Sequence, residues 1–291
     1  MIALTIRHKT TYRYNRPVEL GPHRLMLRPR ESRDLRLISS ELIVQPEAVV
    51  TWAQDVFGNA VATATFAGAS AHLVVDSVAE LELDASAWPV FDVAASAVSY
   101  PFAYLSDDRA DLGTLALQQY PDPMGRLRQW AEAFVADRPT DTLSLLKDLS
   151  AGITAWVRYQ SREDEGTQSP IETLDRGWGS CRDFAVLFTE AARGLGFGAR
   201  IVSGYLYNPE REQDAGTTHA WAEVFVPGAG WITFDPTHRA VGGFNLIPVA
   251  VGRGIHQVMP VAGSFTGMTD AFQGLWVDVS VTAEGRTVPP T

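Results

Sequence analysis

Apolar and polar side chains alternate along the first part of the chain, as they do in strands with one buried face. These stretches are rich in β-branched residues, and "FGNA" at 57–60 is typical of a turn between two of them. Short strands at this spacing predict an N-terminal, antiparallel β-sandwich-like domain over residues 1–95. The predicted strands cover residues 4–15, 23–29, 35–46, 60–66 and 72–84.

The pattern then becomes irregular and, further along, helical. Residues 96–121 contain prolines and a charged "SDDRAD" run, and we expect a surface linker there. After this linker, apolar residues recur at helical spacing, and Asp141 is placed to cap one of the expected helices. The predicted helices cover residues 122–137, 141–159 and 181–196.

A second set of strands follows the last of these helices. Strands are predicted at 198–207, 219–227 and 230–237, and a final one at 275–283. We interpret residues 96–291 as a second unit, a core with a C-terminal extension. A β-rich part followed by helices and antiparallel strands predicts the α+β fold class.

Composition narrows the classes of partner. The formal net charge of −10 argues against a nucleic-acid or anionic-membrane partner, because both require clustered Lys and Arg. No stretch approaches the length of about 18 apolar residues that a membrane span needs. The N-terminal residues have no apolar run typical of a signal peptide, so we expect a cytoplasmic location.

The chain contains one cysteine, Cys181, within "RGWGSCRDFA". A lone cysteine is most often a small buried apolar residue. Here, however, Ser180 can cap a helix and Asp183 completes a capping-box pattern, which puts Cys181 at the first helical position. Free backbone N–H groups and the helix dipole stabilise a thiolate at that position. The sequence therefore predicts a nucleophile, and Gly177 and Gly179 leave room for a substrate backbone beside it.

A thiolate nucleophile also needs a base and a group that orients the base. His219 opens the strand "HAWAEVFV", and Asp235 lies near the end of the strand "GWITFDPT". The "PGAG" between them is typical of a hairpin turn. We therefore expect His219 and Asp235 on neighbouring antiparallel strands.

The register of this hairpin decides whether the two side chains can meet, because side chains alternate between the faces of a sheet. A four-residue loop at 227–230 would pair Val226 with Trp231 and turn Asp235 away from His219. A three-residue loop would pair Val226 with Gly230 and keep both side chains on one face. We predict this loop, with a glycine in the left-handed region and a bulge, or another loop of odd length.

The three residues and their surroundings resemble the catalytic core of the transglutaminase-like superfamily. The pattern "GWGSCRDFAVLFTEAARGLGFGARIVSGYL…THAWAEVFVPGAGWITFDPT" has its three blocks in the order and spacing of that family. The segments "TYRYNRPVELGPHRLMLRPRE" and "DVFGNAVATATF" are similar to the β-domain that precedes the core in a bacterial subgroup. The tail "VAVGRGIHQVMPVAGSFTG" is similar to the C-terminus of that subgroup.

The resemblance implies a papain-like site, in which a helix bearing Cys181 packs on an antiparallel sheet bearing His219 and Asp235. Cys181 would form a thioester with a peptide or glutamine-type amide and pass the acyl group to water or to an amine. The chain would then be a cysteine protease, an amidase or a transglutaminase. One cysteine and scattered histidines give no metal-ligand spacing, and we expect no cofactor or metal. Two alternatives stay open: acyl transfer of the arylamine-acetyltransferase kind, and a non-catalytic binding or scaffold module.

Further residues are candidates for contact with the substrate, which we expect to be a peptide or a protein. The sequence leaves the oligomeric state open. The backbone N–H of Cys181 is an expected oxyanion donor, and Gln160 or Trp178 could supply a second. Trp178 and Trp221 could wall the acyl channel, and Tyr205 could reach the site. The predicted substrate-binding residues are Trp178, Trp221, Tyr205, Gly179 and Gln160.

Overall fold

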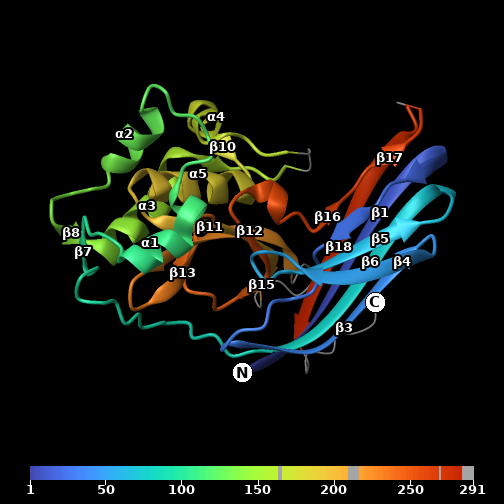
Figure 1. Ribbon diagram of the computed structural model, residues 1–291, viewed down its shortest axis with the longest axis horizontal. Coiled ribbons are helices and arrows are strands. Elements are labelled where there is room, and N and C mark those ends of the chain that lie inside the picture. Colours follow the sequence, from blue (N-terminus) through green and yellow to red (C-terminus); the bar gives the residue numbers. More distant parts are fainter. Residues whose placement is uncertain (163–165, 209–215, 269, 284–291) are drawn as a thin grey trace.

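The computed structural model describes residues 1–162, 166–208, 216–268 and 270–283. Helices gather on one side of the molecule and long strands on the other (Figure 1). The helices are α1 (Ser106–Leu112), α2 (Arg126–Glu132), α3 (Thr142–Trp156), α4 (Pro170–Arg176) and α5 (Cys181–Gly194), with short 3₁₀ turns at Gly113–Ala116 and Ile255–Gln257. The strands before α1 are β1 (Ile2–Leu20), β2 (His23–Leu25), β3 (Leu35–Gln45), β4 (Ala48–Gln54), β5 (Ala60–Phe66), β6 (Ala69–Leu83) and β7 (Ser99–Tyr100). The later strands are β8 (Thr140–Asp141), β9 (Arg158–Tyr159), β10 (Trp178–Gly179), β11 (Gly198–Tyr207), β12 (Gly216–Val226), β13 (Gly230–Asp235), β14 (Ala240–Val241), β15 (Leu246–Gly252), β16 (Val261–Ala262), β17 (Phe265–Thr266) and β18 (Phe272–Ala283).

The N-terminal region is a pair of facing antiparallel sheets. One has the order β17–β1–β6–β3, and the other has the order β16–β2–β5–β4. Leu73 and Val75 of the first sheet and Ala62 and Ala64 of the second lie in one buried cluster between them. The predicted sandwich-like arrangement and the α+β class are therefore confirmed.

The C-terminal segment returns to this sandwich. β18 pairs antiparallel with β1 along most of its length, and in Figure 1 the two run side by side. β17 also pairs with β1, and β16 pairs with β2. The sequence interpretation grouped this extension with the core, but in space its strands complete the N-terminal sheets.

The core consists of α5 packed on a five-stranded antiparallel sheet of order β14–β13–β12–β11–β15. The apolar face of α5 was predicted from its helical spacing, and Phe184, Leu187 and Phe188 are fully buried in the main hydrophobic cluster. Ala222 and Val224 of β12 lie in the same cluster. This packing places the N-terminus of α5, where Cys181 lies, near the start of β12.

The β12–β13 hairpin has the predicted register. Val226 pairs with Gly230, so the loop holds three residues, and Gly228 and Gly230 have φ angles of 85° and 73°. The side chains of His219 and Asp235 accordingly lie on the same face of the sheet.

Several local predictions differ from the structure. The expected linker at 96–121 contains α1 and a 3₁₀ turn, because a short helix that buries little more than Leu112 leaves no visible period among charged residues. The helix predicted at 122–137 is only seven residues long, and the strand predicted at 23–29 ends at Leu25. Asp141 does cap α3, since its carboxylate accepts the N–H of Ser144 at 2.7 Å.

The β4–β5 turn makes two of the contacts that dock the sandwich onto the core. The Asn59 side chain is fully buried, donates to the carbonyl of Val251 at 2.7 Å and accepts the N–H of Val251 at 2.9 Å. This amide pairs with the edge strand β15 as another strand would. Phe57, in the same β4–β5 turn, packs against the buried cluster that contains Trp221. The N-terminal domain therefore supports the strand that carries His219.

Candidate active site

Cys181 is the first residue of α5 and is partly exposed. Ser180 precedes the helix in extended conformation, as predicted for an N-cap. Its N–H and its hydroxyl both donate to Asp183 Oδ2, each at 2.8 Å. The thiol therefore lies at a capped helix N-terminus, where the helix dipole favours a negative charge.

The Asp183 carboxylate is fully buried and connects this helix end to the preceding loop. Besides the two groups of Ser180, it accepts the N–H of Gln168 at 2.8 Å and Arg162 Nη2 at 3.1 Å. A Cβ at Gly179 would lie 3.0 Å from the Asp183 Cβ. Gly179 thus permits close packing against Asp183, a reason beyond the substrate access that the sequence predicted.

His219 and Asp235 form a buried hydrogen-bonded pair. His219 Nε2 lies 2.8 Å from Asp235 Oδ2, and the side chains are 4% and 2% exposed. Because a carboxylate only accepts, Nε2 carries the proton, and Nδ1 is the ring nitrogen left to face Cys181. The Cys181 thiol and the His219 ring are close enough to shift each other's pKa, so the structure brings the three predicted residues together.

The electrostatics favour a charged pair. Burial alone would raise the pKa of Cys181, but His219, the backbone N–H of Ala220 and the charge of Arg182 outweigh it and lower that pKa. Burial would lower the pKa of His219, yet the hydrogen bond with Asp235 and the nearby Cys181 thiol raise it to about 10. Burial of Asp235 is likewise outweighed by its two histidine partners, which hold its pKa well below the usual range. These directions favour a thiolate beside an imidazolium.

Two residues at the site were not singled out from the sequence. His238 Nδ1 lies 2.8 Å from the same Asp235 Oδ2 that binds His219. The available signal was its position three residues after Asp235, within "FDPTH". The second residue is Tyr159, which is half exposed. Its pKa is raised mainly by burial and, to a smaller extent, by the nearby charges of Cys181 and Asp235. No local pattern marks Tyr159, because it reaches the site through the parallel pairing of β9 with β10.

The same pairing determines where the candidate oxyanion donors lie. Trp178 pairs with Arg158, and the backbone N–H of Gln160 donates to the carbonyl of Gly179 at 2.9 Å. Gln160 and Trp178 therefore flank the residues just before Cys181. The backbone N–H of Gln160 is already engaged, which leaves its exposed side-chain amide as the group that could face a substrate.

Trp221 and Tyr205 lie elsewhere than expected. Trp221 is 1% exposed and stacks on His219 with ring centroids 6.0 Å apart. It therefore packs against the imidazole and does not line a solvent-accessible acyl channel. Tyr205 is buried, and its hydroxyl bonds to His8 Nδ1 at 2.9 Å. The reason is alternation: Gly204 pairs with His219 and shares its face, so Tyr205 points to the other face, toward β1.

The described residues include one group with the composition of a cation site, His219, Asp235 and His238. The hydrogen bonds among these side chains account for their proximity without an ion.

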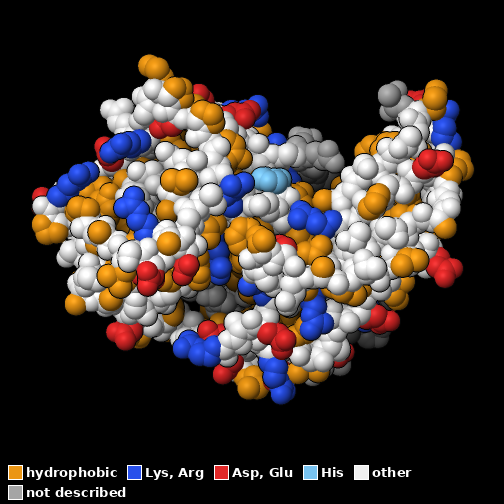
Figure 2. Space-filling view, viewed as in Figure 1, with side chains coloured by type: hydrophobic (Ala, Val, Ile, Leu, Met, Phe, Trp, Pro, Cys, Tyr) orange, Lys and Arg blue, Asp and Glu red, His pale blue; other side chains and the backbone are white. Residues whose placement is uncertain are grey.

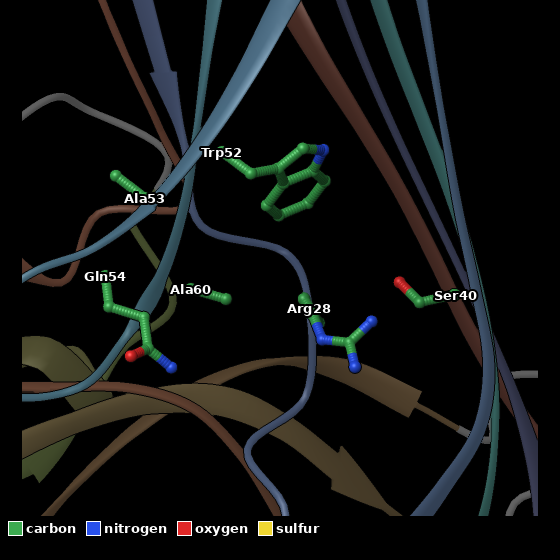
Figure 3. Close-up of a pocket in the computed structure, with 6 residues that line it drawn as sticks. All are labelled: Arg28, Ser40, Trp52, Ala53, Gln54 and Ala60. Carbon is green, nitrogen blue, oxygen red and sulfur yellow. The ribbon is translucent and has the colours of Figure 1, made fainter.

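The molecule is hollowed between its helical and β-rich parts (Figure 2). A pocket of about 520 Å³ lies in the N-terminal region, where the side chains of Arg28, Ser40 and Trp52 border the same space (Figure 3). Its lining residues do not include Cys181, His219 or Asp235, the three residues that we call the triad.

Comparisons with known families match both parts of the chain. Residues 4–82 match the family described as the bacterial transglutaminase-like N-terminal region, and residues 128–236 match the transglutaminase-like superfamily. An uncharacterised protein of Mycobacterium leprae is 34% identical over 121 residues, which cover 38% of this chain and 42% of that protein. The match thus spans less than half of that relative's length.

Among solved structures, the fold is similar to that of a proposed cysteine protease from Cytophaga hutchinsonii. The TM-score is 0.75 at 19% identity, and the alignment covers 99% of this chain and 93% of the other. The periplasmic domain of TgpA from Pseudomonas aeruginosa aligns with a TM-score of 0.37 at 15% identity, over 82% of this chain and 88% of that chain. Within the described part of this chain, no helix combines the length and apolarity needed to cross a membrane.

Proposed function

Since this chain belongs to the transglutaminase-like superfamily, we propose that it is a cysteine-dependent enzyme that forms a thioester with an amide substrate. The observation that carries this proposal is the hydrogen bond of His219 with Asp235, in a position where the imidazole and the Cys181 thiol interact electrostatically. Nucleophile, base and orienting carboxylate are thus in mutual reach, as acyl transfer requires.

The first half of the reaction breaks the amide bond. The Cys181 thiolate attacks the carbonyl carbon, and a negative charge develops on the carbonyl oxygen. The imidazolium of His219 then gives its Nδ1 proton to the departing nitrogen, and the carbon–nitrogen bond breaks to leave a thioester. Asp235 keeps Nε2 protonated and the ring in orientation throughout, because its Oδ2 accepts that N–H.

The second half restores the enzyme. Water or an amine attacks the thioester carbon while His219 Nδ1 takes the proton of the attacking group. The carbon–sulfur bond then breaks, and Cys181 leaves as a thiolate beside the imidazolium. With water the product is a carboxylic acid, as in a protease or amidase; with an amine it is a new amide, as in a transglutaminase.

Groups that border Cys181 would stabilise the oxyanion. Its own backbone N–H is free of intrahelical partners at the first helical position. The Gln160 side chain and the Trp178 indole N–H are the candidates for a second donor, since β9 and β10 bring both beside Gly179. Each such donor is worth about 10²–10³ in rate where it has been removed from other enzymes.

The substrate class that we propose is a peptide or protein that presents a backbone or glutamine-type amide. Cys181 is partly exposed, so such an amide can reach the thiol from solvent. The cytoplasmic location expected from the sequence remains a prediction.

Mass spectrometry of products tests this function. The protein is incubated with a peptide library, with and without a primary amine, and Cys181→Ala serves as the matched control. We expect cleavage or deamidation in water, amine addition if the amine competes, and neither with the alanine variant. Equal product from the variant would reject the nucleophile, and no product from any peptide would favour a binding module.

A further inference from the structure

The Asp235 carboxylate serves two imidazoles, and only one of them has a role in the proposed reaction. Asp235 Oδ2 lies 2.8 Å from His219 Nε2 and 2.8 Å from His238 Nδ1. The two rings are inclined by 62°, with centroids 5.2 Å apart. His238 thus lies beside His219 and bonds to the same oxygen.

The hydrogen bonding of this carboxylate is complete only with His238. The other oxygen, Oδ1, accepts the backbone N–H of Thr237 at 3.0 Å and that of His238 at 3.4 Å. Asp235 is 1% exposed, so water has little access to replace a lost donor. The His238 side chain is 48% exposed, so this buried carboxylate is bonded to a ring that solvent reaches.

We propose that His238 is a positioning residue, whose Nδ1–H holds the Asp235 carboxylate in the orientation that fixes His219. This inference rests on the proposed function. With both histidines in place, each lone-pair direction of Oδ2 has its own N–H donor, and the carboxylate cannot rotate without breaking a bond. Without the His238 donor, Asp235 holds His219 less firmly, and the thiolate of Cys181 becomes less populated.

The test reads the state of Cys181 directly and needs no substrate. Cys181 is the only cysteine of the chain, so iodoacetamide uptake by the native protein reports its thiolate as a function of pH. His238→Asn keeps an N–H near the position of Nδ1, whereas His238→Leu keeps bulk but has no donor. His256→Leu makes the same substitution at an exposed histidine outside the site.

We expect His238→Asn and His256→Leu to follow the wild-type pH profile. His238→Leu should move the midpoint of alkylation upward by about one pH unit, which lowers the rate about tenfold on the acid side of the midpoint. If His238→Leu does not fold, His238→Gln replaces it, because its longer amide places the N–H toward the position of Nε2.

The outcomes separate the two claims. A His238→Leu or His238→Gln profile that is unchanged, or that moves downward, overturns the positioning role while leaving the proposed function intact. A wild-type midpoint at the value of an ordinary thiol overturns the proposed function, and with it this inference.

Discussion

Replacing Asp183 by alanine tests how the N-terminus of α5, and with it Cys181, is held in place. The carboxylate is fully buried and accepts four hydrogen bonds: two from Ser180, one from the N–H of Gln168 and one from Arg162. The Arg162 side chain is 13% exposed, so its charge would lose its partner in a largely buried position. The substitution therefore removes a buried ion pair and leaves three other hydrogen-bond donors without an acceptor.

The magnitude follows from this geometry. Breaking a buried ion pair by removing one partner costs about 3–5 kcal/mol. Each buried donor that loses its acceptor adds about 1–3 kcal/mol to the loss of stability where water cannot reach it. Because Cys181 is partly exposed, water can enter at this end of the helix and bond to the donors that lose Asp183, so we expect a loss close to that of the ion pair alone, about 4 kcal/mol.

Denaturant unfolding followed by circular dichroism measures this loss. Asp175→Ala is the matched control, since Asp175 also pairs with an arginine, Arg126, but both side chains are about half exposed. We expect a large shift of the unfolding midpoint for Asp183→Ala and little shift for the control. Equal shifts would refute the claim that this buried carboxylate organises the site.

Two further predictions concern the strands around the site. Gly204→Ala should destabilise the protein by about 3 kcal/mol or more, because the new Cβ would lie 2.0 Å from the carbonyl oxygen of Ile247 and 2.8 Å from the ring of Trp221; a wild-type unfolding midpoint would contradict this. Burial lowers the pKa of His8 from 6.5 to about 4, so between these values the unfolded chain binds a proton that the folded chain does not. The free energy of unfolding should therefore fall by up to about 3 kcal/mol as the pH drops from about 6.5 to about 4. His8→Asn, which keeps an amide group toward Tyr205, should reduce this slope, and an identical slope in the variant would argue against His8 as its source.

Local rules sufficed for the elements that carry the triad. Alternation along β12 and β13 tied the length of the hairpin loop to whether His219 and Asp235 share a face, and the expected contact between the two side chains selected the odd loop that the structure has. The capping pattern around Ser180 predicted the first residue of α5. These features depend on residues close together in the chain, so the sequence displays them directly.

Features that depend on distant segments were not visible in the same way. The partner of β18 is β1, at the opposite end of the chain, and an alternating pattern says nothing about which strand it will pair with. The orientation of Tyr205 required knowing that Gly204 pairs with His219. His238 gains its contact only because the turn after Asp235 folds its ring back onto the carboxylate.

The most direct test of the central claim is the reaction of native Cys181 with iodoacetamide, compared between wild type and His219→Ala. If His219 and Asp235 stabilise a thiolate, the wild-type midpoint lies well below the value of about 8.5 for an ordinary thiol. Without the imidazole, burial remains as the dominant influence, and the midpoint should move to that value or above it. Identical profiles for the two proteins, or a cysteine that reacts only after denaturation, would contradict the account.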